Sequence, residues 1–173
     1  GHENDGMLET LRSYRDKFCS IRVGSPLLTD MEDYRALSER LLPQFSDLTD
    51  RDALVFMGHG TEHHANAVYP ALDYMFKAGG HPNVHVGTVE GYPDLEQVKS
   101  LVRRQDPSRV FLSPLMVVAG DHACNDMAGD EEDSWKNQFA KEGYPVSCIL
   151  KGLGEYPAVR EMFVEHARKA KPL

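Results

Sequence analysis

Long apolar segments recur along this chain, and each is followed by a segment with helical periodicity. The most continuous segment, DALVFMG at 52–58, is apolar from Ala53 onward, and others follow at 83–91, 108–118 and 145–150. An apolar segment without alternation is typical of a strand that is covered on both faces of its sheet. Strands that alternate with helices at this spacing predict an α/β fold with a mostly parallel sheet and helices on both faces.

Local signals place some of the remaining elements. Residues 19–26 predict a short strand that ends at a Gly and a Pro. Thr29 and Glu32 have the spacing of a capping box and predict the start of a helix. Asp130 is predicted to cap a helix whose early acidic residues complement the helix dipole. His166 belongs to an apolar stripe on the last helix, which predicts a core histidine.

Composition limits the classes of partner. A net charge of −8 argues against nucleic acid, because phosphate binding depends on clustered Lys and Arg. No apolar segment approaches the roughly 20 residues that a membrane helix needs. The three cysteines lie in no C-x-x-C pair, so neither a disulfide framework nor a zinc ribbon is expected. The chain does not begin with Met, so the absence of a signal peptide is not informative.

Three metal-competent side chains follow three successive predicted strands. His59 follows the strand 52–58, Glu90 comes 31 residues later, and His122 another 32 residues on. Each interval is about one strand–helix unit. Right-handed crossovers return successive strands with the same polarity, so we expect all three side chains at the carboxyl edge of the sheet.

Two imidazoles and one carboxylate suit Zn²⁺, Co²⁺, Ni²⁺ or Fe²⁺, and three protein ligands leave a coordination position open. Each residue also has a simpler interpretation: His59 as a hydrogen-bonded loop residue, and Glu90 as a solvated carboxylate. Glycines flank the candidates, and we expect them to let a ligand approach the backbone closely. These glycines are Gly58, Gly60, Gly87, Gly91 and Gly120.

Four further residues are candidates for supporting roles. His63 and His64 are candidate additional ligands or substrate contacts, with surface helix residues as the alternative. Asp121 and Asp126 flank His122 in the sequence. Metal-bound histidines usually need an acceptor on their other ring nitrogen, and either carboxylate could supply it.

Several motifs resemble those of a known family. The chain is similar to the anaerobic-pathway sirohydrochlorin cobaltochelatases, class II chelatases related to ferrochelatase. The resemblance implies that His59, Glu90 and His122 are the metal-binding and catalytic residues. It rests on VFMGHGTEHHANAVYPALDYM, VGTVEGYPDL, PLMVVAGDHACNDMAGDEEDSWK, GLGEYPAVREMFVEHA and GSPLLTDMEDY.

The resemblance also implies an activity. We expect insertion of Co²⁺ into sirohydrochlorin, a tetrapyrrole with eight carboxylates at the precorrin-2 or factor II level, in anaerobic cobalamin biosynthesis. His59 is the candidate proton acceptor. The alternatives are Fe²⁺ insertion for sirohaem or haem, or a non-catalytic metal- or tetrapyrrole-binding module. The divalent ion is the substrate, with Co²⁺ expected and Fe²⁺, Ni²⁺ or Zn²⁺ possible in vitro. No organic cofactor is expected. The expected location is the cytoplasm.

The family's two-lobe organisation implies a division of this chain. Residues 1–24 are expected to be a helix and strand leading from a first lobe that the sequence does not include. Residues 25–173 are expected to form the metal-binding lobe. The first lobe would be lost, nicked or supplied by a partner chain, and a homo-oligomer is possible.

Overall fold

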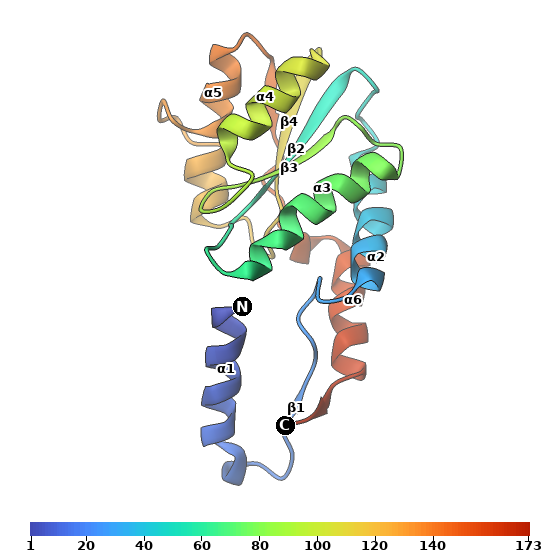
Figure 1. The fold of residues 1–173 in the computed structure, drawn as a ribbon, viewed down its shortest axis with the longest axis vertical. Helices are drawn as coiled ribbons and strands as arrows, with labels where there is room; N and C mark the ends of the chain where they lie inside the picture. The colour runs from blue at the N-terminus through green and yellow to red at the C-terminus, as the bar shows by residue number, and fades with distance from the viewer.

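Four parallel strands form the central sheet of the computed structural model, which describes all of residues 1–173 (Figure 1). They lie in the order β3-β2-β4-β5. All seven residues of the central strand β2 are buried, as expected for a strand covered on both faces. The structure confirms the predicted parallel sheet, with strands shorter than the apolar segments. The strands are β2 (Asp52–Gly58), β3 (Val84–Thr88), β4 (Arg109–Pro114) and β5 (Val146–Cys148).

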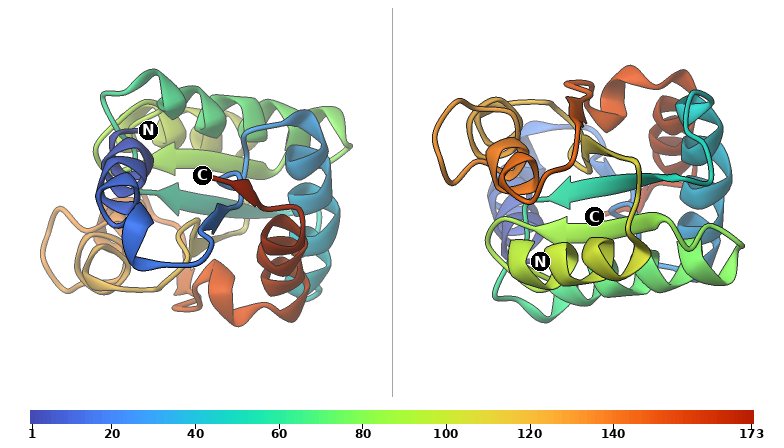
Figure 2. Two further views of the ribbon diagram at one scale, coloured as in Figure 1. Left: turned by 90° about the horizontal axis from the view of Figure 1, so that it is seen from below. Right: turned by 90° about the horizontal axis from the view of Figure 1, so that it is seen from above.

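Helices enclose the sheet on both faces (Figure 2). Because side chains alternate along a strand, Leu54 and Phe56 of β2 pack against α2, α3 and α6, whereas Val55 and Met57 pack against α4 and α5. The helices are α1 (His2–Ser13), α2 (Met31–Leu41), α3 (Val68–Ala78), α4 (Leu95–Gln105), α5 (Trp135–Lys141) and α6 (Pro157–Arg168). Short 3₁₀ turns are η1 (Arg15–Lys17), η2 (Leu42–Phe45), η3 (His64–Ala67) and η5 (Leu153–Glu155), and η4 (His122–Met127) is a π-helical turn.

The C-terminal strand pairs, beyond the sheet, with a strand that follows α1. β1 (Arg22–Val23) pairs antiparallel with β6 (Lys171–Pro172), so the strand predicted over 19–26 is only two residues long. Helix α1 buries none of its residues and extends away from the sheet (Figure 1). No helix has the length and apolarity needed to cross a membrane. The division at residues 24 and 25 stays a prediction.

Two predicted helix caps were wrong by a few residues. Helix α2 begins after Asp30, whose side chain accepts a hydrogen bond from the amide of Asp33, and not after Thr29. Helix α5 begins after Ser134 and not after Asp130. In both cases the capping residue is the one whose side-chain oxygen reaches the amide three residues on.

His166 makes polar contacts that its apolar stripe did not predict. Its Nε2 lies 2.8 Å from Oδ1 of Asp33, and its Nδ1 lies 2.7 Å from the carbonyl oxygen of Ser25. Burial lowers the pKa of His166, but the hydrogen bonds to Ser25 and Asp33 outweigh it and raise the pKa above 6.5. The protonated ring therefore joins α6 both to Asp33 in the first turn of α2 and to Ser25 in the segment that precedes α2.

This pair predicts a pH-dependent contribution to stability. The pKa of His166 is higher in the folded protein than in the unfolded chain. The contribution of this pair to the free energy of unfolding is therefore complete at pH values below the pKa in the unfolded chain. It is lost as the pH rises through the pKa in the folded protein. We expect His166→Gln to lower the free energy of unfolding more at about pH 5.5 than at about pH 9. Urea denaturation at both pH values measures this, with the exposed His81→Gln as control. A loss that is equal at both values, or larger at the higher one, would count against the pair.

Candidate metal centre

Three loops leave the carboxyl ends of β2, β3 and β4 at one edge of the sheet. β2 and β3 end together, with Gly58 opposite Thr88. Their pairing continues into the loops, where the amide of Glu90 donates to the carbonyl oxygen of His59 at 2.7 Å. His122 begins η4 after the longer loop from β4. The parallel topology thus brings the three predicted ligands to one place, as the spacing indicated.

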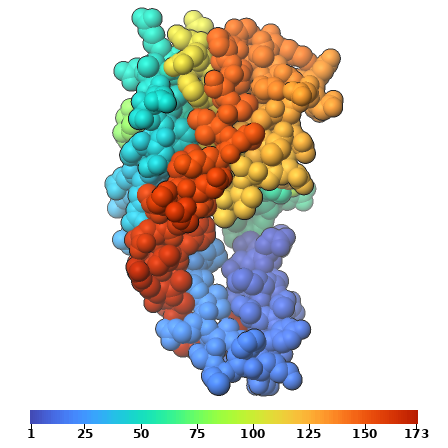
Figure 3. Space-filling model, turned by 180° about the vertical axis from the view of Figure 1, so that it is seen from behind, coloured from blue at the N-terminus to red at the C-terminus, as the bar shows by residue number.

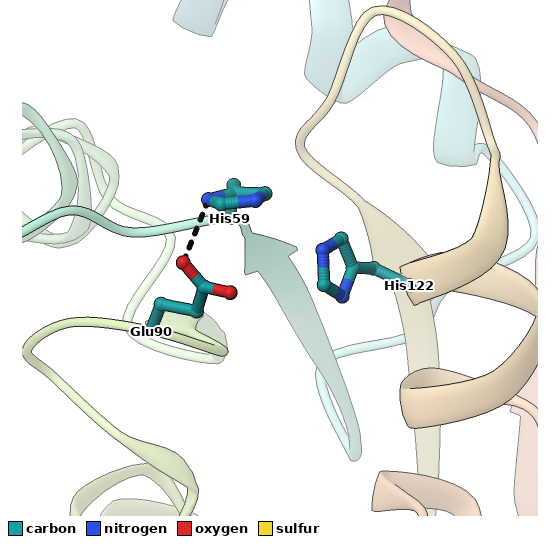
Figure 4. Close-up of side chains that lie close together, drawn as sticks. All are labelled: His59, Glu90 and His122. Carbon is teal, nitrogen blue, oxygen red and sulfur yellow. Dashed lines mark ion pairs between the residues drawn. The ribbon is translucent and has the colours of Figure 1, made fainter. Parts of the chain in front are cut away.

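The three side chains converge (Figure 4). One ligand atom from each of His59, Glu90 and His122 lies within 4.8 Å of the others. The two imidazole rings are 4.7 Å apart and nearly perpendicular, at 87°. The side chains are 48%, 56% and 35% exposed respectively, so the group is open to solvent on one side. Such a set could hold a divalent ion and leave coordination positions for another molecule.

His122 is oriented by a carboxylate. Its Nδ1 lies 2.5 Å from Oδ2 of Asp126, four residues on in the same π-helical turn. Because an ionised carboxylate only accepts hydrogen bonds, Nδ1 carries the proton and Nε2 is left to bind a metal. Isolated π-helical turns are frequent at functional sites. The carboxylate of Asp121, the other candidate acceptor, is exposed and forms no hydrogen bond.

His59 is oriented by a main-chain hydrogen bond and lies beside Glu90, whose Oε2 is 3.7 Å from its Nδ1 (Figure 4). Its Nδ1 lies 2.9 Å from the carbonyl oxygen of Gly60, so this ring also presents Nε2 as its free nitrogen. Gly60 has a φ of +86°, and a Cβ there would lie 2.5 Å from the amide nitrogen of Gly91. A glycine is therefore required both by the backbone conformation and by the approach of the Glu90 loop.

Other glycines near the ligands make room for protein rather than for a ligand. A Cβ on Gly58 would overlap the ring of Tyr69, and one on Gly87 would lie 2.8 Å from Trp135. The predicted close approach of a ligand to these positions was wrong, because neighbouring side chains occupy the space. Gly120 has no atom within 4 Å of its Cβ position and stays open.

His63 and His64 follow His59 closely in the chain but are not part of the group formed by His59, Glu90 and His122. Nδ1 of His63 accepts from the amide of Ala65 at 3.0 Å and caps η3, and its ring centroid is 3.9 Å from that of His64. Loss of solvent contact, followed by the charges of His64 and His2, lowers the pKa of His63. Their predicted roles as ligands or substrate contacts stay predictions.

A polar cavity of about 750 Å³ adjoins the group. One side is formed by His59, Glu90 and the loop 60–62, and the other by His2, Glu3 and Asn4 at the start of α1. No apolar residue lines it. Sequence reasoning missed the α1 residues, because no local pattern connects residue 2 with residue 59; the ring of His2 reaches that of His63 at 4.7 Å.

This chain is similar to known proteins over almost all of its length. The family described as cobalt chelatase (CbiK) matches residues 1–171. The sirohydrochlorin cobaltochelatase of Salmonella typhimurium strain LT2 is 43% identical over 170 residues, which cover 98% of this chain and 64% of that protein. The sirohydrochlorin cobaltochelatase CbiKC of Nitratidesulfovibrio vulgaris strain Hildenborough is 33% identical over 156 residues. These residues cover 90% of this chain and 55% of that protein. The chain thus spans less than two thirds of the length of these curated relatives.

A solved structure shares the fold. DR2241 from Deinococcus radiodurans, described as a multi-domain protein with structural similarity to chelatases, superposes with a TM-score of 0.51. The match covers 81% of this chain and 31% of that chain at 17% identity, so the likeness concerns the fold alone.

Proposed function

The chain belongs to the cobalt chelatase (CbiK) family, and we propose that it takes part in the insertion of Co²⁺ into sirohydrochlorin. Two relatives are known as sirohydrochlorin cobaltochelatases, which supports this metal and this substrate and does not favour Fe²⁺ insertion or a non-catalytic module. The observation that carries the proposal is the convergence of His59, Glu90 and His122 at one edge of the sheet.

The open group of ligands suits an ion that must leave again. Two imidazoles and a carboxylate bind Co²⁺ well, whereas a fourth protein ligand would close the site and retain the ion. All three side chains are at least one third exposed, so a macrocycle can reach the ion from the solvent side. The macrocycle nitrogens then replace the protein ligands.

Insertion exchanges two pyrrolic protons for one Co²⁺, so the site also has to accept protons. The partner of His122 is a carboxylate, which strengthens a histidine as a metal ligand. The hydrogen-bond partner of His59 is a carbonyl, and the nearest carboxylate, that of Glu90, is farther away at 3.7 Å. We therefore assign Glu90 and His122 to holding the ion. Nε2 of His59, once freed by the departing metal, accepts the two pyrrolic protons one after the other and passes each to solvent, since imidazole exchanges protons readily near neutral pH.

The direct test is spectroscopic. The full-length protein is mixed with sirohydrochlorin and Co²⁺ without oxygen, and the absorption bands of the pigment are followed over time. We expect metallation well above the rate with metal and pigment alone. A rate equal to that of the protein-free mixture would overturn the proposal.

Asp126 supplies a second prediction. Loss of the partner that orients a metal-binding histidine typically costs about 10–100-fold in metal affinity or activity, and we expect this of Asp126→Asn. Titration calorimetry with Co²⁺ measures the affinity. The matched control is Asp121→Asn, which removes a neighbouring exposed carboxylate that forms no hydrogen bond. Equal affinities in the two variants would show that Asp126 does not act through His122.

The remaining expectations accompany this proposal. The location proposed is the cytoplasm, because the reaction consumes a biosynthetic intermediate. A first lobe, in the same chain or in a partner chain, and a homo-oligomer stay predictions of the family resemblance.

A further inference from the structure

Two exposed valines stand in the loop that leads to the metal centre. Val117 and Val118 are 52% and 70% exposed, although valine is among the residues most often buried. They lie between the end of β4 and His122. We propose that these two side chains contact the apolar face of the tetrapyrrole while His59, Glu90 and His122 hold the ion. This inference rests on the proposed function.

The backbone of this loop is held firmly. The amide of Leu153 donates to the carbonyl oxygen of Met116 at 2.8 Å, and that of Gly154 donates to Val117 at 2.9 Å. A Cβ on Gly152 would lie 2.5 Å from the carbonyl oxygen of Val117, so only glycine allows this approach. The two valines are therefore exposed on a fixed backbone, and a ligand that packs against them pays little for ordering the loop.

The loop also lies in the right place. It leaves β4 beside the end of β2, where the amide of Leu115 donates to the carbonyl oxygen of Met57, two residues before His59. It then arches beside the two histidines and returns to His122 (Figure 4). In Figure 3 the surface of this part of the chain, yellow to orange, lies on the side of the molecule that faces the blue N-terminal segment.

The chemistry of the substrate requires such a surface. A tetrapyrrole has a flat apolar face and an ionised rim, and ligand sites bury such faces against apolar side chains. The cavity beside the ligands has no apolar residue in its lining. Val117, Val118 and Tyr92 are the exposed large apolar side chains of the three loops that carry the ligands. The two valines, in the loop that leads to His122, supply the apolar side chains that the lining of the cavity lacks.

The test uses the double variant Val117→Thr/Val118→Thr in the full-length protein. Threonine keeps the shape of valine and removes its apolar character. The matched control is Val164→Thr on α6, a valine that is 40% exposed. Binding of metal-free sirohydrochlorin is followed by absorption without oxygen, binding of Co²⁺ by calorimetry, and folding by thermal denaturation.

We expect sirohydrochlorin to bind about tenfold more weakly to the double variant, as the loss of apolar contact on two side chains implies. We expect Co²⁺ affinity and the melting temperature to match those of the control. Pigment affinity within twofold of the control would overturn the inference while leaving the proposed function intact. An equal loss of Co²⁺ affinity would also overturn it, since the loop would then act by supporting His122. Failure of the unmodified protein to bind the pigment would instead refute the proposed function.

Discussion

His122→Ala is expected to reduce Co²⁺-dependent metallation of sirohydrochlorin by at least about 100-fold, because removing even an outer partner of a metal-bound histidine can cost that much. His122 is one of the three side chains of the proposed metal centre and the one that a carboxylate orients. His59→Ala should have an effect of the same order, since it removes both a ligand and the assigned proton acceptor. Initial rates from pigment absorption, at saturating and limiting Co²⁺, measure both.

The matched control is His81→Ala. His81 is exposed and precedes β3, at the end of the sheet opposite the three loops, so its loss should leave the rate unchanged. Activity that survives either substitution at the metal centre, at a level near that of the control, would contradict the assignment.

Phe56→Ala is expected to lower the free energy of unfolding by about 3–5 kcal/mol, the usual cost of removing a large buried aromatic side chain. Phe56 lies in the middle of β2 with no exposed surface. Its ring stacks on Phe76 of α3 at 5.7 Å and meets the edge of Phe45 at 5.4 Å. The substitution would therefore leave a cavity between the sheet and two elements that cannot close it without moving.

Urea denaturation measures this loss, and Phe163→Ala is the control. Phe163 lies on α6 and is 38% exposed, so its truncation should cost much less. Equal losses for the two variants would show that this face of the sheet does not form the core described here.

The sheet and the convergence of its ligands could be predicted because both follow from local pattern and general topology. A continuous apolar segment such as 52–58 has few alternatives to a buried strand, and right-handed crossovers bring successive strand ends to one edge. His59 directly follows β2 and Glu90 lies two residues past the end of β3, so their positions depend little on loop conformation.

Features that depend on tertiary contacts could not be predicted in this way. The sequence left Asp121 and Asp126 as equal candidates, and only the π-helical turn shows which of them reaches His122. The polar bonds of His166 connect segments that are 133 and 141 residues apart in the chain. His2 reaches the cavity because α1 begins at the sheet edge, and no local periodicity indicates that placement.

X-ray absorption at the cobalt edge, on the full-length protein carrying one equivalent of Co²⁺, tests the central claim most directly. The geometry predicts two imidazole nitrogens and a carboxylate oxygen at about 2.0–2.2 Å, with water completing the shell. It also predicts the loss of one imidazole in His122→Ala and no change in His81→Ala. A shell of oxygen atoms alone, or a spectrum that His122→Ala leaves unchanged, would show that Co²⁺ is not held by these three loops.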